Sequence, residues 1–120
     1  MNHSMKKWVA LFFFSLLATS CEKTVPENEI PDWLKTEISQ DEQSIAASPK
    51  SFSAWGSWSR HKWNNDYYFE YTNLVSSSLY IPISFSGDTL YKSVTNPNIQ
   101  YSKEKCCKKL VWKGPLFKGF

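Results

Sequence analysis

The stretch WGSWSRHKWNNDYYFEY, residues 55–71, decides the fold of this chain. Two aromatic-rich runs flank the turn-forming triplet at residues 64–66, an arrangement that predicts a β-hairpin. A three-residue loop pairs Trp63 with Tyr67, His61 with Phe69 and Ser59 with Tyr71. This register gathers the rings of those pairs on one face and leaves Arg60 opposite Glu70 on the other. A two-residue loop would mix core and surface side chains, so the sequence favours the longer loop.

Two further segments extend the predicted sheet. Residues 79–92 alternate between apolar and polar types around a Ser-Gly-Asp turn. Because proline donates no amide hydrogen, Pro82 would place the first strand of this hairpin at an edge or a bulge. Residues 105–113 also alternate, with apolar residues at one parity and lysines at the other. We therefore expect an antiparallel β-meander of about four to five strands.

A helix is predicted before the sheet, between residues 31 and 49. The Pro-Asp pair at residues 31–32 suits a helix start, and one apolar stripe is formed by Leu34, Ile38 and Ile45 before a proline ends the segment. A solvated face is the interpretation of its acidic residues, Glu37, Asp41 and Glu42. The expected fold class is α+β, with one N-terminal amphipathic helix packed on the antiparallel meander.

The first 20 residues have the three parts of a secretory signal. Lys6 and Lys7 precede an apolar run that is far shorter than the roughly 20 residues needed to span a bilayer, and small residues follow it. Residues 17–21, Leu-Ala-Thr-Ser-Cys, resemble the lipobox of bacterial lipoproteins. That resemblance implies cleavage before Cys21 and a lipid anchor on this residue, since two or three acyl chains hold a protein firmly on a membrane.

Three segments follow from this interpretation. Residues 1–20 are expected to be a signal peptide, residues 21–30 a polar lipidated tether, and residues 31–120 a single small α+β domain. The resemblance also implies a location in the bacterial cell envelope, and Glu22 after the cysteine resembles an outer-membrane sorting signal.

The charge of the chain argues against nucleic acid as a partner. The formal net charge of +3 falls to about +1 when the two signal lysines are removed. The remaining charge is uneven, because residues 22–49 hold seven acids and two lysines, whereas residues 50–120 hold four acids and ten bases. The sequence therefore predicts an acidic front and a basic sheet.

Few residues are suited to catalysis. With His3 in the signal, His61 is the remaining histidine, which excludes a zinc site built on two or three histidines. The predicted register places His61 on the core side, so we interpret it as packed or hydrogen-bonded. The sequence has no glycine-rich phosphate loop and no nucleophile-elbow motif. We expect no catalytic residue, metal or cofactor, and a protein that is not an enzyme.

The other two cysteines are adjacent. Consecutive Cα atoms lie about 3.8 Å apart, below the usual disulfide range, so Cys106 and Cys107 are not expected to bond to each other. Cys106 shares the parity of Leu110 and Trp112 and is predicted to be buried. Cys107 would lie among lysines as a candidate reactive thiol.

Aromatic residues supply the binding candidates. The predicted register puts Trp58 and Tyr68 on the outer face of the first hairpin, where exposed rings stack on sugars or anchor a protein. The expected function is a membrane-anchored, non-catalytic binding or accessory module of the bacterial envelope, held by Cys21 and with a protein or carbohydrate as ligand. One alternative is a lipoprotein inhibitor or immunity factor against an envelope protein. Another is a thiol-dependent enzyme or redox sensor that uses Cys107.

Overall fold

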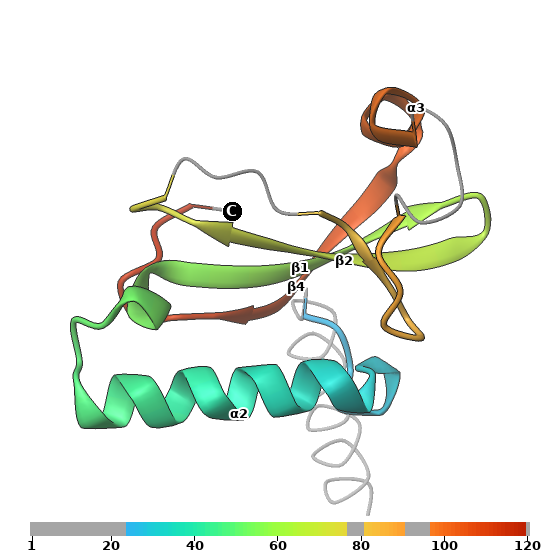
Figure 1. The fold of residues 1–120 in the computed structure, drawn as a ribbon. Helices are drawn as coiled ribbons and strands as arrows, with labels where there is room; N and C mark the ends of the chain where they lie inside the picture. Colours follow the sequence, from blue (N-terminus) through green and yellow to red (C-terminus); the bar gives the residue numbers. More distant parts are fainter. Residues whose placement is uncertain (1–23, 77–80, 91–96, 120) are drawn as a thin grey trace, which may run out of the picture.

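The computed structural model describes residues 24–76, 81–90 and 97–119. Their elements are η1 (Glu27–Glu29), α2 (Asp32–Ala47), η2 (Phe52–Trp55), β1 (Gly56–Trp63), β2 (Asp66–Asn73), β3 (Ile83–Ser84), α3 (Pro97–Glu104) and β4 (Cys106–Lys113). The fold is α+β, with a four-stranded antiparallel sheet whose strand order is β3-β2-β1-β4. In Figure 1, α2 runs along one face of the sheet and α3 lies on the other side.

The strand order corrects the predicted meander. The first three strands follow one another across the sheet, but β4 returns to the far side of β1. The predicted second hairpin is reduced to the short edge strand β3, where Ile83 bridges Thr89. The proline next to β3 agrees with the predicted edge position, since a missing amide costs nothing there. Residues 77–80 and 91–96, which carry part of that prediction, lie outside the described residues.

The first hairpin has the register that the sequence analysis rejected. Its loop is the two-residue turn Asn64-Asn65, with φ values of 50° and 63°. Positive φ at both central residues is the requirement of a type I′ turn, whose twist matches that of the strands. Trp58 therefore lies opposite Tyr71, and Arg60 lies opposite Phe69 rather than Glu70. The preference for one aromatic face was wrong because the domain covers both faces of the sheet.

The face of the sheet toward α2 holds the main core. Leu34 of α2 is fully buried against Trp58 and Phe69, and half-buried apolar residues surround the three. The helix that the sequence predicts is thus present as α2, and its apolar stripe faces the strands. Burying a side chain of this size contributes about 1.5–3 kcal/mol, so these three residues supply much of the attachment of the helix.

The opposite face has a second, smaller core under α3. Trp63 of β1, Leu90 and Tyr101 of α3 are buried together, and Tyr68 of β2 packs against them. The rings of Trp63 and Tyr101 meet edge to face with centroids 5.7 Å apart. The helix α3 was not predicted, because its residues PNIQYSKE show no apolar stripe.

Residues 24–30 are part of the domain rather than a tether. Val25 is buried, and its backbone N–H donates to the Leu110 carbonyl of β4 at 2.8 Å. Glu29 accepts a hydrogen bond at 2.8 Å from the buried Arg60, and Ile30 packs on the main core. The predicted tether was wrong over these residues because a buried arginine needs a carboxylate partner, and this segment supplies it.

We predict that the turn residue Asn65 limits stability through its positive φ. Asn65→Gly should raise the free energy of unfolding by about 0.5 kcal/mol, and Asn65→Val should lower it by about 1–2 kcal/mol, because a β-branched residue resists this conformation. Urea denaturation measures both changes. Thr72→Gly, at an exposed strand position, is the control and should destabilise. An Asn65→Gly variant as unstable as this control would contradict the turn assignment.

Candidate functional site

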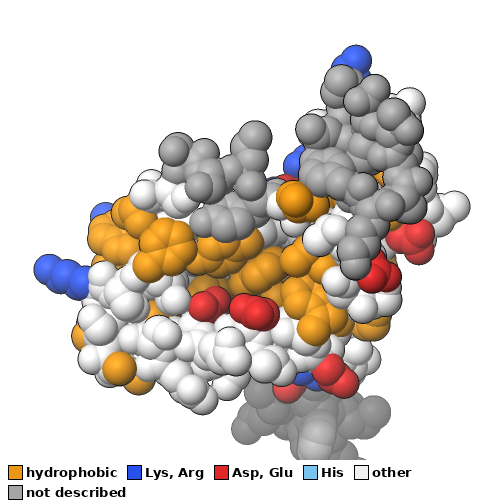
Figure 2. All heavy atoms as spheres, in the orientation of Figure 1, with side chains coloured by type: hydrophobic (Ala, Val, Ile, Leu, Met, Phe, Trp, Pro, Cys, Tyr) orange, Lys and Arg blue, Asp and Glu red, His pale blue; other side chains and the backbone are white. Residues whose placement is uncertain are grey.

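A pocket of about 300 Å³ opens where α2 meets the sheet. We call it the α2–sheet pocket, and its lining residues come from four elements: Glu37 and Asp41 of α2, Phe52 and Ser53 of η2, Trp58 of β1 and Tyr71 of β2. Figure 2 shows acidic side chains against a band of hydrophobic side chains in this region. Its volume is at the lower end of the range for small-molecule sites.

Two aromatic rings form the floor of the α2–sheet pocket. Trp58 and Tyr71 are cross-strand partners, and their ring centroids are 5.2 Å apart. Gly56 leaves room for this arrangement, since a Cβ there would collide with the Tyr71 ring. Phe52 stands beside them with 51% of its surface exposed, so the pocket has an aromatic wall that solvent reaches.

Polar groups enter the same pocket from two sides. The Ser53 hydroxyl donates to Asp41 Oδ1 at 3.1 Å. The Trp58 indole Nε1 is buried and has no hydrogen-bond partner in the described parts of the chain, although it lies near the Asp41 carboxylate. Burial raises the pKa of Asp41 above its ordinary value, and the Ser53 hydroxyl and the Trp58 indole offset part of that rise. The pocket therefore combines an unused donor with a strong acceptor.

The structure separates the two predicted binding residues. Trp58 is only 7% exposed and faces α2, so its predicted position on an outer surface was wrong. Tyr68 lies on the opposite face, half-buried against Trp63 and Tyr101, where it lines a cavity of about 400 Å³. The one-residue change in register puts the two residues on opposite faces, and neither face is an exposed outer surface because α2 covers one and α3 the other.

Sequence reasoning missed the remaining residues of the α2–sheet pocket. A signal was present, because Asp41 falls three residues after Ile38 and four before Ile45, within the apolar stripe of the helix. An acid in such a stripe faces the sheet rather than solvent, and Asp41 is indeed half-buried. Its interpretation as part of a solvated face was wrong.

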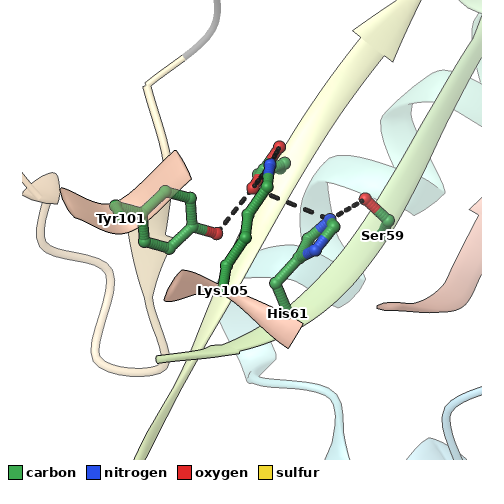
Figure 3. A network of polar contacts seen from close by, with 5 residues as sticks. Ser59, His61, Tyr101 and Lys105 are labelled. Carbon is green, nitrogen blue, oxygen red and sulfur yellow. Dashed lines mark hydrogen bonds and ion pairs between the residues drawn. The ribbon is translucent and has the colours of Figure 1, made fainter. Parts of the chain in front are cut away.

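The face under α3 carries a polar network (Figure 3). Ser59 Oγ lies 3.1 Å from His61 Nε2, and Glu70 Oε2 lies 3.6 Å from the same nitrogen. Glu70 also accepts hydrogen bonds from the Tyr101 hydroxyl at 2.5 Å and from Lys105 Nζ at 2.9 Å. The prediction of a packed or hydrogen-bonded His61 agrees with this arrangement, since the side chain is buried and pairs with Ser59.

This network differs from a catalytic triad in the position of its acid. In a catalytic triad the acid and the nucleophile contact different ring nitrogens, whereas Ser59 and Glu70 both approach Nε2 of His61. The Glu70 carboxylate therefore does not hold the opposite ring nitrogen, as the acid of a triad does. Ser59 and His61 are also almost completely buried.

Electrostatics keep the network in one protonation state. Burial lowers the pKa of His61, the Glu70 carboxylate opposes this, and the charges of Lys105 and Lys108 add to the lowering. For Glu70, burial alone would raise the pKa, but the Tyr101 and Lys105 hydrogen bonds and the nearby positive charges lower it overall. A neutral imidazole beside an ionised carboxylate is the resulting state at neutral pH.

The cysteine prediction is corrected. Cys106 and Cys107 form a disulfide across adjacent residues, with Cα atoms 3.7 Å apart, and both are exposed. Cys107 has a φ of 65° at an irregularity where β4 has one more residue than β1. The strand geometry assumed from the sequence is thus absent at this point. Cys107 is not a thiol in this structure.

Among residues 24–76, 81–90 and 97–119, no group of three potential metal ligands comes together, and no helix is long and apolar enough to span a membrane. Cys21 and residues 1–20 lie outside the described residues.

No protein-family model, curated protein or solved structure matches this chain.

We predict that acid destabilises the domain in two stages. The folded-state pKa values of His61 and Glu70 lie below their ordinary values of 6.5 and 4.5. Stability is therefore complete above these values and is lost as the pH falls below about 6.5, and again below about 4.5. His61→Gln should remove the first loss and Glu70→Gln the second, as measured by urea midpoints between pH 8 and 3. Equal slopes in all three proteins would contradict this assignment.

We predict that the folded chain has no reactive thiol at residues 106 and 107. In a full-length Cys21→Ser protein, a thiol reagent in denaturant should label no cysteine before reduction and both afterwards, since a disulfide does not react. Adding Cys107→Ser should free one thiol without reduction. One labelled cysteine in the unreduced Cys21→Ser chain would disprove the bond.

Proposed function

We propose that this chain is a lipid-anchored, non-catalytic binding module of the bacterial cell envelope. The α2–sheet pocket carries the binding part of the proposal, because it exposes an aromatic wall while a buried indole N–H and a carboxylate lie within it. Most buried polar groups in folded proteins have a partner, so an unused donor in an open pocket favours an external acceptor.

The arrangement of the polar network favours binding over catalysis. Ser59 and His61 are buried, and the shared Nε2 atom leaves the histidine poorly placed to activate the serine. These groups instead hold the α3 face together through Glu70 and Lys105. The disulfide between Cys106 and Cys107 likewise leaves no thiolate for the thiol-dependent alternative.

The anchoring part of the proposal rests on Cys21 and on the position of Thr24. Thr24 bridges Leu110 at the outer side of β4, and two residues separate it from Cys21. Three residue steps span at most about 10 Å. A lipid on Cys21 would therefore hold this edge of the domain close to the membrane surface, where the lysines of β4 favour anionic headgroups.

We predict that Cys21→Ser releases the protein from the membrane. The native chain, expressed in a bacterial host, should fractionate with membranes and incorporate labelled palmitate, because acyl chains on Cys21 provide the attachment. The variant should be soluble and unlabelled. A chain with both Cys106→Ser and Cys107→Ser is the control and should keep its label. An unlabelled native chain, or a Cys21→Ser variant that still takes up palmitate, would refute the anchor.

A further inference from the structure

The α2–sheet pocket identifies the chemical class of its ligand through its donors and acceptors. Trp58 Nε1 is a donor without acceptor capacity, and it approaches the Asp41 carboxylate without reaching the geometry of a hydrogen bond among the described residues. An ionised Asp41 only accepts, and Ser53 uses one of its oxygens. A carboxylate offers about four acceptor positions, so capacity is left beside the indole. A ligand group that both accepts and donates satisfies the two side chains together.

Hydroxyl groups have this double capacity. One hydroxyl accepts from the Trp58 indole and donates to the Asp41 carboxylate, which already lies near it. An ammonium or guanidinium group would satisfy Asp41 but leave the indole N–H unpaired, because it has no acceptor. An anion would satisfy the indole but would meet the negative charges of Asp41 and Glu37, both of which line the pocket.

Aromatic walls restrict the ligand further. Trp58 and Tyr71 are held in place by the sheet and by each other, and Phe52 is half exposed at their side. Such rings favour a flat apolar surface. A sugar ring presents its C–H groups as an apolar face and its hydroxyls around the edge. The pocket volume of about 300 Å³ suits a small ligand.

We infer that the α2–sheet pocket binds a neutral carbohydrate, with one sugar ring against the aromatic wall and a hydroxyl bridging Trp58 and Asp41. This inference rests on the binding function proposed above and names its ligand class. Glu37, exposed on α2 one turn before Asp41, offers a second acceptor for a neighbouring hydroxyl. The site is therefore selective for neutral polyols over charged ligands.

Saturation-transfer NMR on the full-length chain tests the inference. The chain is purified from whichever cell fraction holds it, in a detergent without sugar or choline groups if one is needed. The probes are glucose, galactose, mannose, N-acetylglucosamine, maltose and cellobiose, with choline and acetate at the same concentration. At least one neutral sugar should receive saturation, and choline and acetate should not.

Two variants locate the binding at the α2–sheet pocket. Trp58→Phe keeps an aromatic ring and removes the N–H, and Asp41→Ala removes the acceptor from a half-buried helical position. Each should weaken sugar binding at least tenfold, since a hydrogen bond to the ligand is lost. The matched controls are Trp112→Phe and Glu42→Ala, which lie outside the pocket and should bind as the native chain does. Circular dichroism identifies any variant that fails to fold, and if Trp58→Phe does so, the half-buried variant Asp41→Ala decides.

Three results would overturn the inference: no saturation of any neutral sugar, saturation of choline or acetate alone, or sugar binding that both Asp41→Ala and Trp58→Phe leave unchanged. The proposed lipid anchor on Cys21 can fail independently of the carbohydrate site. A native chain without palmitate that still binds a sugar through Trp58 and Asp41 would contradict the anchor and keep the carbohydrate site. A palmitate-labelled chain that binds no sugar would support the anchor and contradict the carbohydrate site.

Discussion

The register between β1 and β2 is the constraint on which the rest of the structure depends. The two-residue turn at Asn64-Asn65 fixes it, because both residues adopt the positive φ of a type I′ turn. A shift of one residue would move every β2 side chain to the other face. With the observed register, Trp58 and Tyr71 share the α2 face, and His61 and Glu70 face the side of α3.

Much of the architecture was predictable where one local sequence pattern determines the type of element. The apolar stripe of α2, the alternation in β4 and the proline beside β3 each indicate the element that the structure contains. The register was not predictable from aromatic grouping, because two covering layers require apolar residues on both faces of the sheet. Arg60 shows the same difficulty, since its burial depends on Glu29, a partner 31 residues away. The polar helix α3 carries no stripe and depends on Tyr101, buried against the sheet.

The sequence identified only part of the candidate site. Trp58 was identified for its aromatic ring, but the reason given was exposure, and the indole is buried. What makes it a candidate is the unused N–H beside Asp41, a relation between two elements that no local pattern shows. Asp41 interrupts the apolar stripe between Ile38 and Ile45, and an acid in that position is the sequence feature that points to a polar pocket. For Cys106 and Cys107, the expectation that one side chain is buried and the other exposed failed because it assumed regular strand geometry, which the positive φ of Cys107 interrupts.

Neighbouring residues of β1 serve opposite purposes because a strand alternates its side chains. Trp58 reaches the open pocket under α2, whereas Ser59 joins the closed network with His61 and Glu70. The closed face is satisfied internally, since the carboxylate takes hydrogen bonds from Tyr101 and Lys105. The open face keeps a donor and an acceptor close together without joining them. An unpaired buried donor costs free energy, and a ligand hydroxyl that pairs with it recovers that cost on binding. In the proposed function, the same strand thus provides rigidity on one face and a contact for the ligand on the other.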